Sequence, residues 1–249
     1  MVGKASRVAQ VVPAARPFVG ALWAALTASQ RSRSSPSPEA SPGDVAVRRF
    51  CPSACWLRAL IKGDGDHLMD LERLVWARGP APASVSSWSV RFDASTTGAG
   101  GVLYHGDKAL EHWSLKFDPI PHLDVIVGSS KYQSFWESLA LLVCLMIWGS
   151  SFVHECLAVL GDNTSALQNA QDFKGRREIL AVNRELAWRA ARFGWAFEVG
   201  HVPTEKNLVA DALSRMWDRE PSSFPSSALA NSRCREPPRI DKLWRTKTD

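Results

Sequence analysis

The segment from His201 to Arg215 restricts the possible folds more than any other part of the sequence. A polar turn marked by Pro203 leads directly into an amphipathic pattern that predicts a helix over residues 205–216. Asp211 lies among the apolar residues near the first turn of this helix, where a buried carboxylate is unfavourable unless it has a partner. The ordinary interpretation is an exposed acid that interacts with the helix dipole. Other acids in comparable settings would favour a functional interpretation.

Three further acids occur in such settings. Asp93 ends an alternating, strand-like segment and precedes a glycine-rich turn, so we expect it on a β-hairpin. Glu137 is the one acid of residues 135–148, which are apolar nearly all round, as in a buried helix. Asp162 ends a short apolar strand just before a helix begins. Each acid is therefore placed where a functional group is common.

These four acids, in this order and in these settings, resemble those of ribonuclease H. The interval from His201 through Asn207 to Asp211 is similar to that of the family, and the ending Ala-Asp-Ala-Leu-Ser-Arg is similar to that of type 1 ribonuclease H domains of retrotransposon reverse transcriptases. Tyrosine-recombinase (DIRS-like) elements are the most similar branch. The resemblance extends over residues 86–218.

The pattern of elements predicts an α/β fold with a ribonuclease H-like mixed sheet of five strands. An antiparallel meander should be followed by parallel strands, and helices should flank the sheet. The expected strands are 87–92, 101–104, 109–117, 156–161 and 196–199, and the expected helices are 133–149, 164–171, 177–193 and 205–216. A small helical extension should precede this domain.

Four clustered carboxylates repel one another, so such a cluster requires cations. Oxygen ligands without cysteine or histidine favour magnesium, with manganese as an alternative. Two ions about 4 Å apart can hold both the attacking and the leaving oxygen of a displacement at phosphorus. The resemblance implies this reaction on the RNA strand of an RNA:DNA hybrid. It also implies that Asp93 bridges both ions, that Asp162 binds the ion that activates water, and that Glu137 and Asp211 hold the other ion.

The resemblance also gives roles to residues outside the four acids. His201 matches a mobile loop histidine that assists proton movement or product departure. Asn207 is expected to be structural, as a loop-bracing or helix-start residue. Backbone groups around residues 94–96 resemble those that recognise the 2′-hydroxyl of RNA, and nearby cations are candidate phosphate contacts, with an ordinary solvated face as the alternative. The expected nucleic-acid contacts are Ala94, Ser95, Thr96, Asn163, Lys174, Arg176, Arg177 and Arg215.

Residues 1–85 are expected to form a basic extension of the catalytic domain. Residues 1–38 contain no acid and many Ala and Ser, as mitochondrial transit peptides do. The same residues resemble the segment after the polymerase palm in DIRS-like elements, which favours a truncated polymerase end. Residues 30–44 are rich in Ser, Pro and Arg and predict a flexible linker, and residues 219–249 predict a disordered tail.

Composition restricts the class of protein only broadly. A net charge of +5 favours a polyanionic partner. The five cysteines are an odd number in dissimilar settings, so no disulfide framework is predicted and a reducing compartment is favoured. No apolar window reaches the roughly 20 residues needed to cross a bilayer, so no membrane span is expected. A nuclear or cytoplasmic location is favoured, and a mitochondrial one is the alternative.

Two other functions compete with that of a retroelement nuclease. One is an inactive ribonuclease H-like connection module that only binds nucleic acid, and the presence of all four acids argues against it. The other is a mitochondrial cellular ribonuclease H, which would need a working transit peptide. The chain has no Asp-Asp pair of the kind found in polymerase sites, so we expect no DNA synthesis by it. The polymerase part of a reverse transcriptase would be its natural partner.

Overall fold

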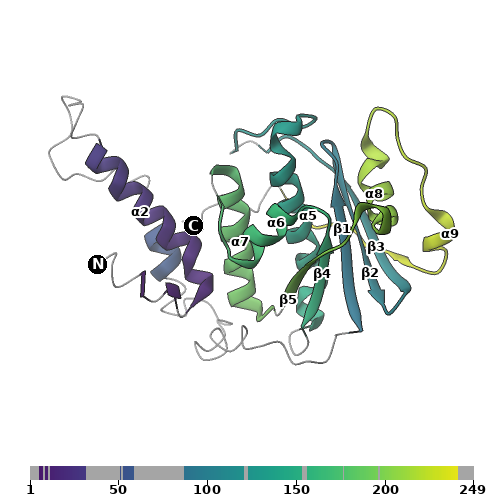
Figure 1. Cartoon of the computed structure of the whole chain (residues 1–249), viewed down its shortest axis with the longest axis horizontal. Helices are drawn as coiled ribbons and strands as arrows, with labels where there is room; N and C mark the ends of the chain where they lie inside the picture. The colour runs from purple at the N-terminus through teal and green to yellow at the C-terminus, as the bar shows by residue number, and fades with distance from the viewer. Residues whose placement is uncertain are drawn as a thin grey trace.

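A mixed β-sheet forms the centre of the computed structural model, which describes residues 6–7, 9–10, 12–31, 51, 53–58, 87–120, 123–152, 156–175, 177–195 and 197–240. The strands lie in the order β5-β4-β1-β2-β3-β6 (Figure 1). Their bounds are β1 Trp88–Ala94, β2 Gly98–His105, β3 Lys108–Lys116, β4 Leu157–Gly161, β5 Phe197–His201 and β6 Arg233–Cys234. The predicted mixture of antiparallel and parallel strands is confirmed, although the described part of the sheet has six strands where five were predicted.

The first three strands form the predicted antiparallel meander. β1 pairs with β2 so that Asp93 lies opposite Gly100, and β2 pairs in turn with β3. Gly106, in the tight turn between β2 and β3, has a φ of 59°, a left-handed conformation that suits glycine. On the other side of β1, β4 and then β5 are added in parallel. Parallel neighbours end at the same edge of a sheet, so the residues that follow β1, β4 and β5 are brought close together.

Helices cover both faces of this sheet (Figure 1). A side chain at Gly100 would point at Leu213 in α8, whereas one at Gly101 would point at Cys144 in α5. Successive strand residues face opposite sides, so α5 and α8 lie on opposite faces. The helices are α2 Arg16–Arg31, α5 Gln133–Trp148, α6 Thr164–Gln171, α7 Arg177–Phe193, α8 Leu208–Ser214 and α9 Ser226–Leu229. Short 3-10 turns are η1 Pro13–Ala15, η3 Ser130–Tyr132, η4 Gly149–Phe152, η5 Thr204–Lys206 and η6 Arg215–Trp217.

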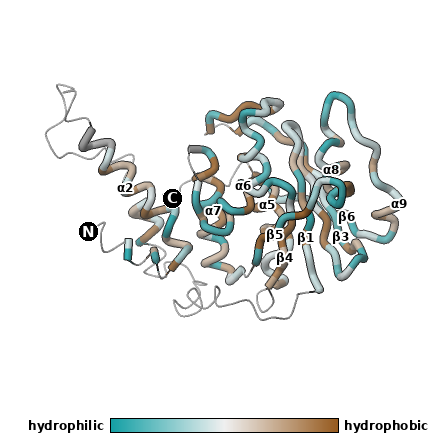
Figure 2. The backbone as a smooth tube through the Cα atoms, viewed as in Figure 1, coloured by the Kyte–Doolittle hydropathy of each residue, from teal (hydrophilic) through white to brown (hydrophobic). Residues whose placement is uncertain are grey.

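The helix α5 is the centre of the hydrophobic core. Its residues from Phe135 to Leu145 are all buried, as the nearly uniform apolar sequence predicts. Figure 2 shows hydrophobic stretches on α5 and on the strands that it covers. Among the described residues, one segment, Ser130–Phe152, is long and apolar enough to cross a membrane by length and composition, which corrects the expectation that none is. Of its apolar window, 78% is buried inside the protein, as in a core helix.

Residues 219–240 pack on the sheet with defined elements, which differs from the disorder predicted for them. β6 pairs in parallel with β3 at the edge of the sheet, and the backbone nitrogen of Arg235 donates to the carbonyl of His112 at 2.7 Å. The His112 ring and the Ser232 hydroxyl are hydrogen-bonded at 2.7 Å. Leu229 and Ile240 are buried. The burial of Leu229 and Ile240 and the pairing with the edge of β3 therefore hold this segment in place, although its Pro-, Ser- and Arg-rich composition resembles that of a disordered chain.

The described part of the N-terminal extension is helical, as expected, and packs against α7. Phe18 of α2 stacks on Trp56 with ring centroids 5.1 Å apart, and Trp56 meets Trp188 of α7 edge-on at 4.8 Å. Arg16 forms an ion pair with Asp172 at 3.7 Å. Residues 30 and 31 of the predicted linker belong to α2, and the other linker residues lie outside the described ones, as do residues 241–249.

Candidate active site

Three of the predicted acids come together where β1 and β4 end. Asp93 lies near the end of β1, Asp162 directly follows β4, and Glu137 lies in the first turns of α5. Each offers a carboxylate oxygen, and these three atoms all lie within 4.8 Å of one another. Glu137 reaches the cluster despite the long segment between β3 and α5. The three acids come from distant parts of the sequence, so the fold itself assembles this group.

Asp211 lines the same depression but is not a member of the close group of three. The cavity has a volume of about 430 Å³ and is also lined by Ala94, Asn163 and Arg215. The Arg215 Nε donates to Asp211 Oδ1 at 2.7 Å. The fourth acid, Asp211, thus faces the site from α8, and the guanidinium of Arg215 already balances its charge.

Burial makes Asp93 difficult to ionise. Its side chain is only 5% exposed, and this desolvation raises its pKa from the ordinary 3.8 to about 6. The Ser214 hydroxyl opposes the rise by donating to Asp93 Oδ2 at 2.5 Å, whereas the negative charges of Asp162 and Asp211 add to it. The ionised form of Asp93 is therefore disfavoured mainly by burial and further by the neighbouring acids.

Glu137 is even less accessible to solvent, with 2% exposure. Desolvation, together with the charge of Asp93, raises its pKa well above the ordinary range. Gln133 holds the carboxylate in place, because its Nε2 donates both to Glu137 Oε1 at 3.0 Å and to the carbonyl of Ala94 at 2.5 Å. Within the described part of the chain, the buried Oε2 of Glu137 has no hydrogen-bond partner. A carboxylate oxygen left in this way fits a cation, and a donor set of carboxylate oxygens fits magnesium or manganese.

Polar residues from the neighbouring loops brace the site. Thr204 donates to Asp162 Oδ2 at 3.0 Å. Asn163 Oδ1 accepts from the backbone nitrogen of Ala166 at 3.0 Å, which caps the start of α6. Asn207 is buried, and its Nδ2 donates to the carbonyl of Phe92 at 2.9 Å. The contact of Asn207 agrees with the structural role predicted for it, because it ties the loop after β5 to β1.

The turn after β1 makes its hydrogen bonds within the protein. The backbone nitrogen of Ser95 donates to the carbonyl of Gly98 at 2.8 Å, and the carbonyl of Thr96 accepts from Gly128 at 2.8 Å. The Ser95 hydroxyl donates to Asp218 Oδ1 at 2.8 Å, and the Thr97 hydroxyl contacts the same oxygen. Of the three residues predicted to recognise RNA here, only Ala94 lines the cavity.

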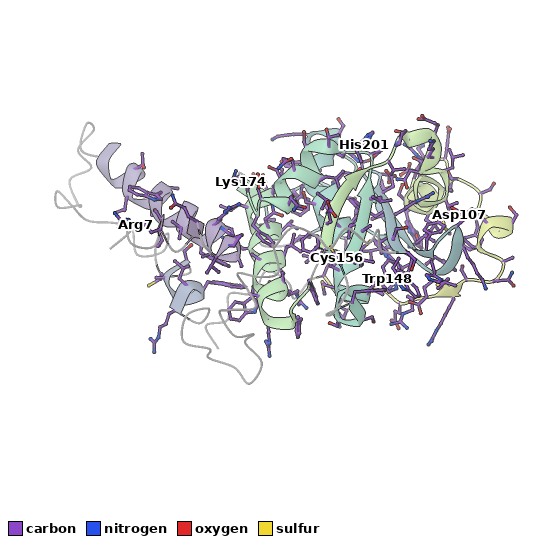
Figure 3. All side chains as sticks on the ribbon, turned by 60° about the horizontal axis from the view of Figure 1, so that its bottom comes forward. Arg7, Asp107, Trp148, Cys156, Lys174 and His201 are labelled. Carbon is purple, nitrogen blue, oxygen red and sulfur yellow. The ribbon has the colours of Figure 1, made fainter. Side chains whose placement is uncertain are left out.

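Among the predicted basic residues that the structure describes, Arg215 lines the cavity with the acids and Lys174 does not. Lys174 pairs with Asp172 at 3.1 Å and borders a different cavity beside α2, and Figure 3 shows it well apart from His201. Arg176 and the Arg177 side chain lie outside the described residues. His201 is exposed at the end of β5, where its backbone pairs with Gly161, next to Asp162. Arg215 is therefore the predicted basic group whose side chain the described structure places beside the acids, and the backbone of His201 lies next to Asp162.

Five residues of the site were missed in the sequence. They are Gln133, Thr164, Thr204, Ser214 and Asp218. Gln133 precedes Glu137 by four positions and Ser214 follows Asp211 by three, so helical spacing could have placed both beside a predicted acid. Thr204 and Asp218 carry no comparable signal, since loops and tertiary pairing position them.

The pKa of Asp93 predicts a pH dependence for the metal-free chain. The folded state holds the proton up to about pH 6, whereas the unfolded state releases it near the ordinary 3.8. The free energy of unfolding should therefore fall as the pH rises from about 4 to about 6, by about 3 kcal/mol for this group. The raised pKa of Glu137 acts in the same direction. Urea denaturation between pH 4 and 7.5 in EDTA checks this, and magnesium should restore the loss at neutral pH. Stability that rises through this window would contradict it.

The chain matches no known protein-family model and no curated protein. Among solved structures it is similar to RNase H1 from the halophilic archaeon Halobacterium salinarum NRC-1, with 22% sequence identity over 52% of this chain and 95% of that chain and a TM-score of 0.39. It is also similar to LC11-RNase H1 in complex with an RNA/DNA hybrid, with 20% identity over 51% of this chain and 92% of that chain and a TM-score of 0.39. At this identity and score, neither similarity defines an activity for this chain.

Proposed function

We propose that this chain hydrolyses the RNA strand of RNA:DNA hybrids with the help of two divalent cations. The observation that carries the proposal is the convergence of Asp93, Glu137 and Asp162, whose ligand oxygens lie within 4.8 Å of one another. The elevated pKa of Asp93 supports it, because burial first, and then the charges of Asp162 and Asp211, disfavour its ionised form when no cation is bound. Structural acids seldom gather in this way at the ends of parallel strands, where functional groups are commonly placed.

Asp93, Glu137 and Asp162 would hold the cations, with Asp211 as a further ligand from α8. Bound magnesium or manganese would supply Lewis-acid activation of water and of the scissile phosphate. The unpartnered Oε2 of Glu137 is the clearest sign that these residues fit such an ion. The open depression of about 430 Å³ gives a phosphate access to the same oxygens.

The surrounding residues would keep the acids in position. Ser214 fixes one oxygen of Asp93, and Gln133 turns Glu137 toward the same point. Asn207 ties the loop after β5 to the end of β1. That loop begins at His201, whose backbone pairs with Gly161, the residue before Asp162. The role proposed for His201, from the resemblance to ribonuclease H, is to assist proton movement or product departure.

The choice of a hybrid as substrate follows from the resemblance of residues 86–218 to ribonuclease H. The turn after β1 lies beside the acids, where Ala94 faces the cavity and a strand entering the site would present its 2′-hydroxyl groups. The moderately basic composition favours a polyanion. We place the chain in a retroelement reverse transcriptase of the DIRS-like type, with the polymerase part as partner and a nuclear or cytoplasmic location.

Cleavage of strand-labelled duplexes tests the proposal. The full chain with magnesium should cut the RNA strand of a hybrid, leave 3′-hydroxyl and 5′-phosphate ends, and spare double-stranded DNA and double-stranded RNA. EDTA should stop the reaction, because the carboxylates alone cannot activate water. Tight binding of the hybrid without cutting, in both magnesium and manganese, would instead identify an inactive binding module.

A further inference from the structure

Arg215 connects the fourth acid of the site to the turn after β1. Its Nε donates to Asp211 Oδ1 at 2.7 Å, and its Nη1 lies 3.9 Å from Asp218 Oδ2. The other oxygen of Asp218 accepts hydrogen bonds from the hydroxyls of Ser95 and Thr97. Asp218 is thus fixed on one side by the turn, so it can anchor the guanidinium on the other.

Arg215 is also the one cation among the described residues that line the cavity. Its side chain is about half exposed (51%), and it stands opposite the buried acids Asp93 and Glu137. Asp211, Asp93 and Asp218 all raise the pKa of Arg215, and the largest cause is the hydrogen bond that Arg215 donates to Asp211. The guanidinium is therefore permanently charged and lies in the negative potential of the site.

We propose that Arg215 is the internal counter-ion of Asp211 in the cation-free chain, and that a divalent cation must displace it from this carboxylate to bind. The proposal rests on the proposed use of divalent cations by the site. Arg215 and a divalent cation compete for the same oxygen of Asp211, and they repel each other across the cavity. The affinity for the cation is thus lowered by a charge that the chain itself supplies.

The displaced side chain has a defined place to go. Asp218 lies one turn further along the chain and already holds the outer part of the guanidinium, so Arg215 can turn from Asp211 to the mouth of the cavity without leaving the site. There its free N–H groups would face solvent and any phosphate that approaches the bound cation. Binding of the divalent cation would thus free the Arg215 side chain to contact a phosphate.

Isothermal titration of magnesium into the full chain, without nucleic acid, tests the exchange. The Arg215→Gln variant should bind magnesium on the order of tenfold more tightly, the Coulomb effect of one charge about 6 Å from a divalent ion in a water-like medium. Arg215→Lys keeps the charge and should stay near the wild-type affinity. Arg189→Gln is a matched control, because Arg189 forms the same kind of pair with Glu185 on α7, at 2.6 Å and away from the acids. Its affinity for magnesium should be unchanged.

Unchanged or weaker magnesium binding by Arg215→Gln would overturn the exchange, and so would the absence of magnesium binding in every variant. Arg215→Met gives a second charge-free variant should the glutamine variant not fold, and thermal melting identifies that case. Hybrid cleavage by the wild-type chain is scored separately. If Arg215→Gln binds magnesium more tightly but the wild-type chain never cuts a hybrid, the exchange is supported and the proposed function is refuted. If the wild-type chain cuts a hybrid but Arg215→Gln has unaltered magnesium affinity, the proposed function is supported and the exchange is refuted.

Discussion

Replacing Asp93 by asparagine should reduce cleavage of the RNA strand by roughly 10³-fold or more. Asp93 is the most central of the three converging acids, because it interacts with Asp162, Asp211 and Glu137. Asparagine has nearly the same volume and can still accept the hydrogen bond from Ser214, but it carries no charge to hold a cation. The loss should appear in the turnover rate of a strand-labelled hybrid at saturating magnesium.

The same variant should gain stability while it loses activity. An ionised Asp93 destabilises the metal-free fold at neutral pH, since its pKa is raised to about 6. The variant should therefore melt at a higher temperature than the wild type in EDTA, and magnesium should stabilise it less. Asp107→Asn is the control, because Asp107 lies exposed in the turn between β2 and β3 (Figure 3). A folded Asp93→Asn variant that still cuts hybrids would refute the assignment of the site.

Adding a single methyl group at Gly100 should detach α8 from the sheet. A Cβ atom there would lie 2.3 Å from the Cβ of Leu213 and 3.0 Å from the backbone nitrogen of Ser214. No change of rotamer relieves a clash with backbone and Cβ atoms, so the helix that carries Asp211 must move. Gly100→Ala should lower the free energy of unfolding by about 3 kcal/mol, as overpacking of a tight core does. Chemical denaturation at constant pH and magnesium measures this loss.

Activity should fall with stability in this variant, because Ser214 and Asp211 move with α8. Gly20→Ala is the matched control, since Gly20 lies in α2 and a Cβ atom there meets nothing within 4 Å. That control should be neutral or slightly stabilising, because alanine favours a helix over glycine. Wild-type stability and cleavage in Gly100→Ala would show that α8 does not depend on close contact with β2.

Periodicity was enough to predict most of the sheet and the central helix. The alternating pattern before Asp93 and the uniformly apolar run around Glu137 each fit one type of element, and both elements formed where expected. Parallel pairing of β1 and β4 then fixes Asp162 beside Asp93. Three of the four acids could therefore be placed from local pattern and chain order.

The rest depends on contacts that local pattern does not encode. Lys174 lies beside Arg176 and Arg177 in the sequence, yet its ammonium turns to Asp172, near α2. Asp211 was predicted as a metal ligand. It also forms an ion pair with Arg215, four residues later on the same side of the helix, and this ion pair competes with metal binding. The docking of residues 219–240 follows from tertiary contacts of Leu229 and Ile240, which composition cannot indicate.

The short strand β6 has a consequence for the behaviour of the molecule in solution. An uncovered edge strand presents unpaired backbone N–H and C=O groups, which can recruit a strand from another molecule and start aggregation. β6 occupies part of the outer edge of β3 at Glu111 and His112, and Arg235 extends the cover by one hydrogen bond. Residues 233–235 thus shield this part of β3 from intermolecular strand pairing. A fragment that ends at Asp218 would keep all four acids but would leave this edge open.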